Sequence, residues 1–162
     1  MKTIRRIRIG EFDLFKQIRL RALKEAPYAF SSTYESALQR SEESWREQAE
    51  NSAQGSDRAT FIAFSDDAPV GIAALYRVEN QTNVGAMLQV WVAPEHRGTG
   101  VARDLIDAIF EWAGENNFRM ILSRIRDGNI RAQKFYTKYG FSNSDEFSSS
   151  DFDGVCLVKE VL

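Results

Sequence analysis

The chain has 162 residues, of which 43% are hydrophobic, and its formal net charge is −2. These values suit one domain with a continuous core, and the nearly balanced charge argues against a protein that coats nucleic acid. The single cysteine, Cys156, excludes an internal disulfide and favours a reducing compartment. The basic start lacks the apolar run of a signal peptide, and no stretch approaches the roughly 20 apolar residues of a membrane span. We expect one cytoplasmic domain, residues 1–162, with no membrane or nucleic-acid partner.

The first 60 residues contain one strand pattern and two helix patterns. Residues 3–9 alternate isoleucine imperfectly with arginine, which is typical of a short strand with one wet face. Apolar residues then recur at helical spacing as far as Pro27, which breaks the pattern. The run Ser41-Glu42-Glu43-Ser44 indicates the start of a second, short helix, because serine favours the N-cap and acids suit the positive end of the helix dipole.

From residue 60 onward the pattern changes to that of strands. Three strands joined by turns at 66–69 and 80–83 predict a meander, and an amphipathic helix follows them. A strand, a helix that ends at Gly140 and two closing strands around a serine-rich loop (142–154) complete the chain, with serines 148–150 predicted to be flexible. The predicted strands are residues 60–65, 70–78, 84–92, 120–125, 141–147 and 155–161, and the helices are 99–113 and 129–139.

The order β-α-α-β-β-β-α-β-α-β-β predicts an α/β (α+β mixed) fold with one mixed sheet. Its strand–helix–strand unit, residues 84–125, should be a right-handed parallel crossover.

The segment around residues 97–102 carries the most functional information. A strand ends at Pro94, two glycines follow, and a helix begins at once. Such a turn aims unpaired backbone N–H groups and the positive helix end at one point. Glycines 98 and 100 let the backbone approach a ligand, and the planar charge of Arg97 suits phosphate oxygens. We expect the loop to bind a pyrophosphate; the alternative is that the two glycines only shape a strand-to-helix turn.

Two other phosphate motifs are excluded. A Walker loop requires Gly-Lys-Ser/Thr, whereas Gly100 is followed by Val101-Ala102. A dinucleotide fingerprint requires a third small residue where Arg103 stands.

Two motifs resemble those of one enzyme family. Arg-x-x-Gly-x-Ala at residues 97–102 resembles the Gln/Arg-x-x-Gly-x-Gly/Ala signature of the GNAT N-acetyltransferase superfamily. Residues 129–141, Asn-Ile-Arg-Ala-Gln-Lys-Phe-Tyr-Thr-Lys-Tyr-Gly-Phe, resemble the family's Asn-x-x-Ala-x-x-Phe-Tyr-x-Lys-x-Gly-Phe run. The order of elements also fits a GNAT-like fold across nearly the whole chain.

The resemblance implies that acetyl-CoA is the co-substrate. Backbone amides of residues 98–102, with Arg97, would hold the pyrophosphate, and strand 90–92 would pair with the pantetheine arm as an added strand does. That strand would splay from strand 120–125, with the thioester in the gap and Asn129 against the pantetheine arm. The residues implied to bind the cofactor are Val90, Trp91, Val92, Arg97, Gly98, Thr99, Gly100, Val101, Ala102 and Asn129.

The resemblance also places Tyr136 beside the sulfur, where it would protonate the leaving thiolate. A phenol with pKa near 10 and a thiol with pKa about 8.5 can share a proton without a large mismatch. Periodicity alone favours a core role, because Ala132, Phe135, Tyr136 and Tyr139 recur at helical spacing. The predicted reaction is direct attack by a primary amine of a small molecule or peptide, with a backbone amide of strand 90–92 stabilising the oxyanion.

No general base is identified. Strand 84–92 has no acidic residue, and Gln89 is its only polar side chain apart from the Trp91 indole. Glu79 is one candidate base; the alternative is that Glu79 is only a solvated acid in a turn. A water chain is equally open, and an amine of low pKa would need no strong base. His96 is predicted to be exposed beside the loop, and Cys156 is interpreted as packing.

The acceptor and its pocket are not fixed by the sequence. In similar family members the segment 22–35 and the final hairpin wall the acceptor pocket, so Phe30, Tyr34 and Trp45 are candidates to line it or, alternatively, to cap the core. Acids at 35, 145 and 146 are candidates to attract a cationic amine. We expect no metal; a homodimer and a larger acyl group are left open. A non-catalytic acyl-CoA-binding regulator is the alternative function.

Overall fold

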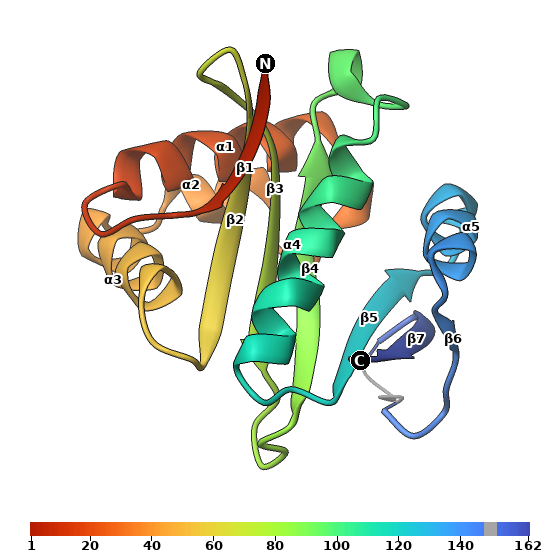
Figure 1. Cartoon of the computed structure of the whole chain (residues 1–162). Coiled ribbons are helices and arrows are strands. Elements are labelled where there is room, and N and C mark those ends of the chain that lie inside the picture. The colour runs from red at the N-terminus through yellow and green to blue at the C-terminus, as the bar shows by residue number, and fades with distance from the viewer. Residues whose placement is uncertain (148–151) are drawn as a thin grey trace.

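The computed structural model describes residues 1–147 and 152–162, and in these residues a seven-stranded sheet has helices on both faces (Figure 1). The strand order is β1-β2-β3-β4-β5-β7-β6, with β4 and β5 parallel and all other neighbours antiparallel. The strands are β1 (Lys2–Arg6), β2 (Arg58–Ser65), β3 (Ala68–Arg77), β4 (Val84–Val92), β5 (Met120–Arg126), β6 (Ser142–Asn143) and β7 (Gly154–Glu160). The helices are α1 (Phe12–Glu25), α2 (Tyr34–Leu38), α3 (Glu42–Ala53), α4 (Val101–Glu115) and α5 (Ile130–Tyr139), with 3-10 turns η1 (Pro27–Ala29) and η2 (Pro94–His96).

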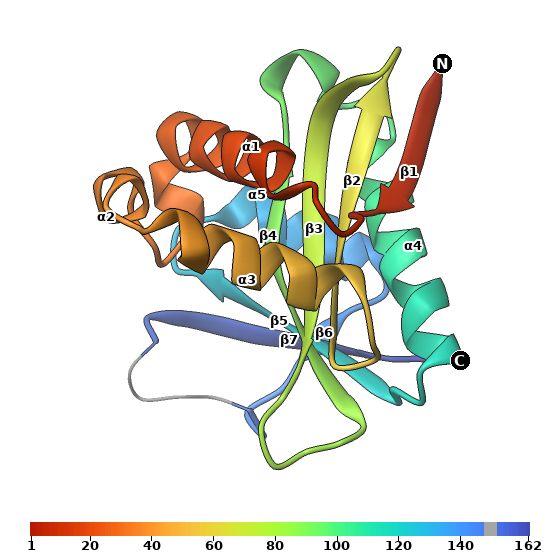
Figure 2. The ribbon, with the colours of Figure 1, turned by 90° about the vertical axis from the view of Figure 1, so that its left-hand side faces the viewer.

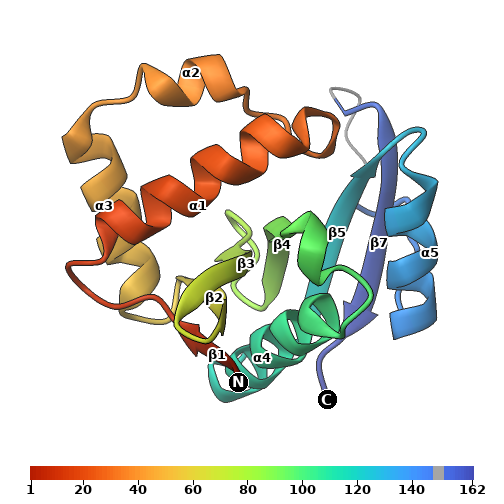
Figure 3. The ribbon, with the colours of Figure 1, turned by 90° about the horizontal axis from the view of Figure 1, so that it is seen from above.

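The helices divide between the two faces of the sheet. Helices α1 and α3 cross one face, in front of β2, β3 and β4 in Figure 2. Helix α4 lies on the opposite face (Figure 3) and packs against β1 to β4. Within the described residues, every helix is too short or too polar to qualify as a transmembrane span.

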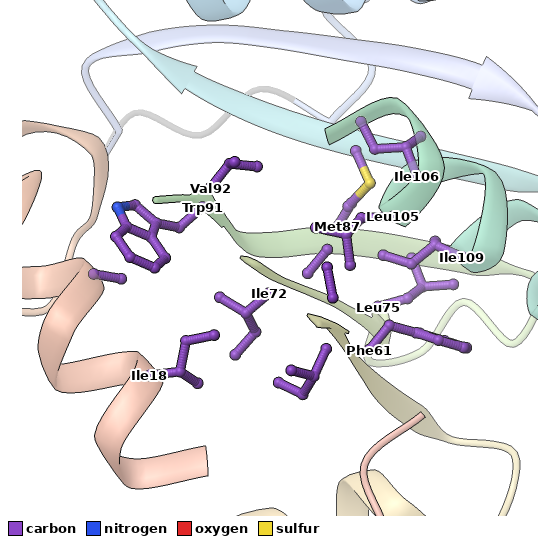
Figure 4. Close-up of a cluster of buried hydrophobic side chains, with 14 of the residues drawn as sticks. Ile18, Phe61, Ile72, Leu75, Met87, Trp91, Val92, Leu105, Ile106 and Ile109 are labelled. Carbon is purple, nitrogen blue, oxygen red and sulfur yellow. The ribbon is translucent and has the colours of Figure 1, made fainter. Parts of the chain in front are cut away.

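Apolar stripes on α1 and α4 enclose the sheet in one main core. Leu105, Ile106 and Ile109 of α4 are fully buried and lie on the Leu75 and Met87 side of the sheet (Figure 4). Burial of each such side chain stabilises the fold by about 1.5 to 3 kcal/mol relative to exposure. On the other face Ile18 of α1 points toward the sheet.

A smaller apolar cluster lies beside the parallel strand pair. It consists of Val84, Leu122, Phe147 and Cys156. Cys156 is buried in this cluster, which confirms its interpretation as a packing residue.

The α/β class, the meander and the parallel unit are confirmed. Strands β2, β3 and β4 are neighbours in that order, and β4 pairs in parallel with β5. The Ser41 side chain accepts from the Ser44 backbone N–H at 3.1 Å, as expected of an N-cap.

Several predicted boundaries are wrong for local reasons. The strand predicted over 3–9 ends at Arg6. The β2–β3 turn is Asp66-Asp67 alone, because both residues adopt positive φ, 49° and 71°, as a two-residue hairpin turn requires. Helix α2 was not predicted; a reciprocal capping box between Thr33 and Ser36 begins it.

The predicted strand 141–147 is reduced to β6, two residues long. The chain turns where the Ser144 hydroxyl accepts from the Glu146 backbone N–H at 3.2 Å, as serine often does in turns. The serine cluster 148–150, predicted to be flexible, lies outside the described residues.

Candidate active site

The parallel pairing of β4 and β5 stops halfway along both strands. The last partners are Met87 and Ser123, although β4 continues to Val92 and β5 to Arg126. The ribbons diverge beyond this point (Figure 1), which confirms the expected splay. Residues 89 and 90 of β4 face a single residue of β3, and Gln89 adopts a left-handed φ of 61°. Such a bulge bends a strand and redirects its side chains, here at the start of the gap.

Two cavities of similar size adjoin the gap. We call the first, of about 360 Å³, the loop cavity, because residues 96–98 and 100–103 form one side of it. The second, of about 370 Å³, is the Arg19 cavity; α1, residues 29–32 and the diverging ends of β4 and β5 border it. Both cavities are lined by Ala29, Val90, Asn129, Ala132 and Tyr136. A molecule in one cavity therefore adjoins a molecule in the other at the gap.

The glycines of the loop are required by its backbone conformation. Gly98 and Gly100 have φ values of 79° and 89°, in the left-handed region that only glycine adopts at little cost. Among the described residues, a Cβ at Gly98 would meet no atom within 4 Å, and one at Gly100 would meet only the Lys2 ammonium, at 3.6 Å. Gly100 is the N-cap of α4 and offers no side-chain acceptor, so the first N–H groups of α4 remain available to an anion. Val101 and Ala102 line the loop cavity beside them.

The Arg97 guanidinium is directed to the protein rather than to an open anion site. Its Nε donates to the Val92 carbonyl at 3.0 Å, and its Nη2 donates to Glu25 Oε1. The same Oε1 accepts from the Trp91 indole N–H at 2.9 Å. Burial disfavours the charged carboxylate, yet the hydrogen bonds from Trp91 and Arg97 lower the pKa of Glu25 below its ordinary value. Arg97 therefore fastens the loop to α1 while it also lines the loop cavity.

The remaining polar residues of the loop have structural partners or line the cavity. Thr99 is not among the residues lining the loop cavity in the described part of the chain; its hydroxyl donates to the His96 carbonyl. The Lys2 ammonium donates to the Thr99 carbonyl at 3.3 Å and pairs with Asp104 at 2.7 Å. His96 is partly buried and lines the loop cavity, so the prediction that it is exposed is wrong.

Tyr136 belongs both to the core and to the site. Its side chain is 5% exposed, and its ring makes edge contacts with Phe135 and Phe141 at centroid distances of 5.4 Å. It also lines both cavities at the gap. Burial raises the pKa of Tyr136 well above the ordinary value, and a hydrogen bond with the Ser123 side chain acts in the opposite direction. The phenol is therefore held in its protonated form, and its pKa lies further above that of a thiol than the ordinary values predict.

Asn129 has a structural role beside its place in the site. Its Oδ1 accepts from the Ala132 backbone N–H at 3.3 Å and so caps α5. Because both Asn129 and Ala132 line the two cavities, the cap also fixes the end of α5 that faces the gap.

The three aromatic residues predicted for the acceptor side lie in different environments. Phe30 lines the Arg19 cavity, whereas Tyr34, in the described residues, lines neither cavity and lies under the Lys24 ammonium, 5.7 Å from its ring centroid. Trp45 is 1% exposed and packs edge-on against Phe15. This position matches the alternative in which Trp45 belongs to the core.

The proposed acids do not lie at the gap. Glu79 lines a separate cavity between the β3–β4 turn and the start of β2. In the described residues neither cavity is lined by Glu35, Asp145 or Glu146.

Sequence reasoning missed Arg19, Ser123 and Glu25. Arg19 is 6% exposed and lines the cavity that now carries its name. A signal for it was present, because Arg19 lies four residues after Phe15 and three before Ala22, on the apolar stripe of α1. A charged side chain on a buried stripe indicates a partner or a ligand. Ser123 and Glu25 act through contacts between distant segments, which periodicity does not reveal.

The chain is similar to proteins of one family. A sequence profile described as the acetyltransferase (GNAT) family matches residues 20–141. The uncharacterized N-acetyltransferase YobR of Bacillus subtilis (strain 168) is 32% identical over 75 residues, which are 46% of this chain and 30% of YobR. Streptothricin acetyltransferase A of the same organism is 29% identical over 85 residues, 52% of this chain and 47% of that protein. The chain thus spans less than half the length of these curated relatives.

Comparison with solved structures supports the fold. The crystal structure of PaiA N-acetyltransferase from Thermoplasma acidophilum, in complex with coenzyme A, superposes with a TM-score of 0.75 at 16% identity and 99% coverage of both chains. At this identity the likeness establishes the fold. Because the family profile covers most of the sequence, this chain belongs to the GNAT family of acetyltransferases.

Proposed function

We propose that the chain transfers an acetyl group from acetyl-CoA to a primary amine of a small molecule or peptide. The observation that carries the proposal is the meeting of two cavities at the β4–β5 gap, with Tyr136 in the wall of both. A reaction between two substrates needs two such approaches to one point. Two observations support this assignment: the relative YobR is named as an N-acetyltransferase, and the Thermoplasma protein has coenzyme A bound.

Acetyl-CoA is proposed to occupy the loop cavity. Backbone N–H groups of residues 98–102 would receive the pyrophosphate at the start of α4, while Arg97, tied to Glu25, holds the loop in place. Beyond Met87, β4 has no pairing with β5, so residues 90–92 present a strand edge to the pantetheine amides. Asn129 and Tyr136 then border the thioester end.

The reaction is proposed to proceed by direct attack. The amine nitrogen forms a bond to the acetyl carbonyl carbon, and a backbone N–H of residues 90–92 donates to the oxyanion; one such donor contributes about 3 kcal/mol in other acyl transfers. The carbon–sulfur bond then breaks, and Tyr136 donates its proton to the leaving thiolate. The extra proton of the attacking nitrogen passes to water, and the Tyr136 phenolate regains a proton from the same source.

The acceptor amine is proposed to lose its ammonium proton to water. None of the described residues that line the Arg19 cavity is acidic, so no carboxylate in the described walls acts as the base. An amine of pKa about 10.4 costs roughly 4.6 kcal/mol to deprotonate at neutral pH. Activity is therefore expected to rise with pH over the neutral range.

A thiol-release assay tests the proposed function. Purified chain with acetyl-CoA and a panel of primary amines should release coenzyme A in step with formation of an acetylated amine, detected by mass spectrometry. Tight binding of acetyl-CoA without release across the panel would contradict catalysis and favour the non-catalytic acyl-CoA-binding regulator.

A further inference from the structure

Arg19 is a largely buried cation that lines the Arg19 cavity. The residue is 6% exposed, and its Nη1 has no hydrogen-bond partner among the residues that the structure describes. The guanidinium stacks over the Phe30 ring at 5.1 Å from the centroid, which fixes its plane. A buried guanidinium nitrogen without a hydrogen-bond partner is costly, and a bound anion would offset that cost.

The other charged side chains that line the described wall of the Arg19 cavity are also cationic. The pKa of Arg19 is lowered to about 10, chiefly by burial; Arg40 acts in the same direction and Tyr76 in the opposite one. The side chain therefore remains charged at neutral pH. The cavity is also lined by Arg124 and Arg126, and the described part of its wall contains no acidic residue. The positive potential of these arginines is opposite in sign to the net charge of the chain, −2, and would concentrate anions in the cavity.

The same cavity contains an unpartnered acceptor. Gln89 Oε1 is buried and finds no hydrogen-bond partner in the described part of the chain, and Gln89 lines the Arg19 cavity at the bulge. Val90, the next residue, lines both cavities. The cavity thus offers a cationic fork on α1 and an amide oxygen next to the gap. An amino acid carries the complementary groups, a carboxylate and an amine N–H.

We propose that the acceptor is an amine that also carries a carboxylate, as an amino acid does, with the carboxylate bound by Arg19 and the amine by Gln89 at the gap. The inference rests on the proposed function for the fate of the amine, but the binding of the carboxylate is a separate claim. The planar fork of Arg19 matches a carboxylate with two parallel hydrogen bonds. A polycationic acceptor is disfavoured, because its second charge would meet three arginines.

The test compares amino acids with their carboxamides, which keep the amine and side chain but lose the negative charge. Binding is measured calorimetrically with coenzyme A present, and turnover is measured separately with acetyl-CoA. The wild type should prefer the carboxylate member of at least one pair by about tenfold or more, as expected for a charged hydrogen-bonded pair. Equal binding within every pair would overturn the inference.

Substitutions assign the preference to Arg19. Arg19→Met should abolish it by weakening the carboxylate member alone, whereas Arg19→Lys should keep part of it. Gln89→Gly, which suits the positive φ, should weaken both members of a pair equally. Arg46→Met is the matched control, because Arg46 also stacks on an aromatic ring, Phe12 at 4.6 Å, but lines neither cavity in the described residues. An unchanged preference in Arg19→Met would contradict the inference even if that variant were less stable, because both pair members are measured on the same protein.

The outcomes separate this inference from the proposed function. Arg19-dependent carboxylate binding without thiol release in any reaction would retain the ligand class and reject the transferase. Turnover of neutral amines as efficient as that of amino acids would retain the transferase and reject the ligand class. Comparison of phosphoethanolamine with ethanolamine forms a further arm: a preference for phosphate without one for carboxylate would overturn the amino-acid assignment.

Discussion

The Trp91 indole of β4 donates to the Glu25 carboxylate at the end of α1, with 2.9 Å between Nε1 and Oε1. Arg97 donates to the same oxygen, so one carboxylate joins α1, the strand that borders the gap, and the loop. The Trp91 ring lies on the α1 side of β4 (Figure 4). The loop therefore depends on a residue 72 positions earlier in the chain.

Glu25→Gln should lower the free energy of unfolding by about 0.5 to 1 kcal/mol at pH 7, a range that allows for solvent screening of a partly exposed pair. The amide oxygen still accepts from Trp91, but the ion pair with Arg97 is lost. The pKa of Glu25 is lowered in the folded chain, so its contribution is present above the ordinary value of about 4.3 and is lost as pH falls through the lowered value. Urea unfolding at pH 7 and below pH 4 measures this; a difference between the proteins that persists unchanged in acid would contradict it.

Tyr136→Phe should lower kcat about 100-fold, the lower end for loss of a general acid. The acetyl-CoA dissociation constant should change little, because the ring and its packing remain. Tyr139→Phe is the matched control: Tyr139 lies on the same helix, donates to Asp107 and, in the described residues, lines neither cavity. Equal effects of the two substitutions, or normal turnover in Tyr136→Phe, would remove the phenol from the mechanism.

The pH profile of kcat/KM should rise from pH 6.5 toward pH 9.5 as the amine loses its proton. Burial raises the pKa of Tyr136 above its ordinary value of 10, so the acid stays protonated over this range and produces no descending limb. Initial rates with wild type and Tyr136→Phe test this. A fall above pH 8.5 in the wild type that is missing from the variant would show that Tyr136 titrates much lower.

Gly100→Ala should weaken acetyl-CoA binding by roughly tenfold, because alanine at φ 89° is strained by about 1 to 2 kcal/mol and shifts the start of α4. Gly10→Ala is the matched control, since Gly10 has φ 92° and an added Cβ would meet no atom within 4 Å. Both variants should lose similar stability in a thermal scan. Similar cofactor affinity in the two would mean that the loop conformation is not what binds the cofactor.

Arg19→Met should leave the melting temperature unchanged or raise it by about 2 to 4 °C, which corresponds to roughly 1 kcal/mol. The substitution removes a buried charge whose Nη1 lacks a hydrogen-bond partner within residues 1–147 and 152–162, and it keeps an unbranched side chain. Differential scanning calorimetry without ligand measures the change. A marked loss of stability would indicate that Arg19 is held by compensating contacts and is not reserved for a ligand.

Much of the fold could be predicted because its elements follow local periodicity. The apolar stripe of α4 and the strands β2, β3 and β4 are visible in the sequence. The motif at residues 97–102 overlaps the start of α4, and the motif at residues 129–141 spans α5. The bulge at Gln89 could not be predicted, because its position depends on the register between β3 and β4. The short β6 likewise depends on a turn formed by side-chain hydrogen bonds.

The site was predictable on its cofactor side and poorly predictable on its acceptor side. A loop of consecutive residues such as Gly98–Gly100 is defined by its own sequence. The Arg19 cavity is assembled from α1, residues 29–32, β4 and β5, and no local pattern reports which of these segments meet. The predicted acids Glu79 and Glu35 lie outside the described wall of this cavity, which is lined by arginines instead.

The most direct test is the stoichiometry of thiol release and amine acetylation by the purified chain. With acetyl-CoA and an accepted amine, we predict one coenzyme A released for each acetylated amine formed, at a rate that falls about 100-fold in Tyr136→Phe. Saturable acetyl-CoA binding without any acetylated product, across amino acids and neutral amines alike, would contradict the account.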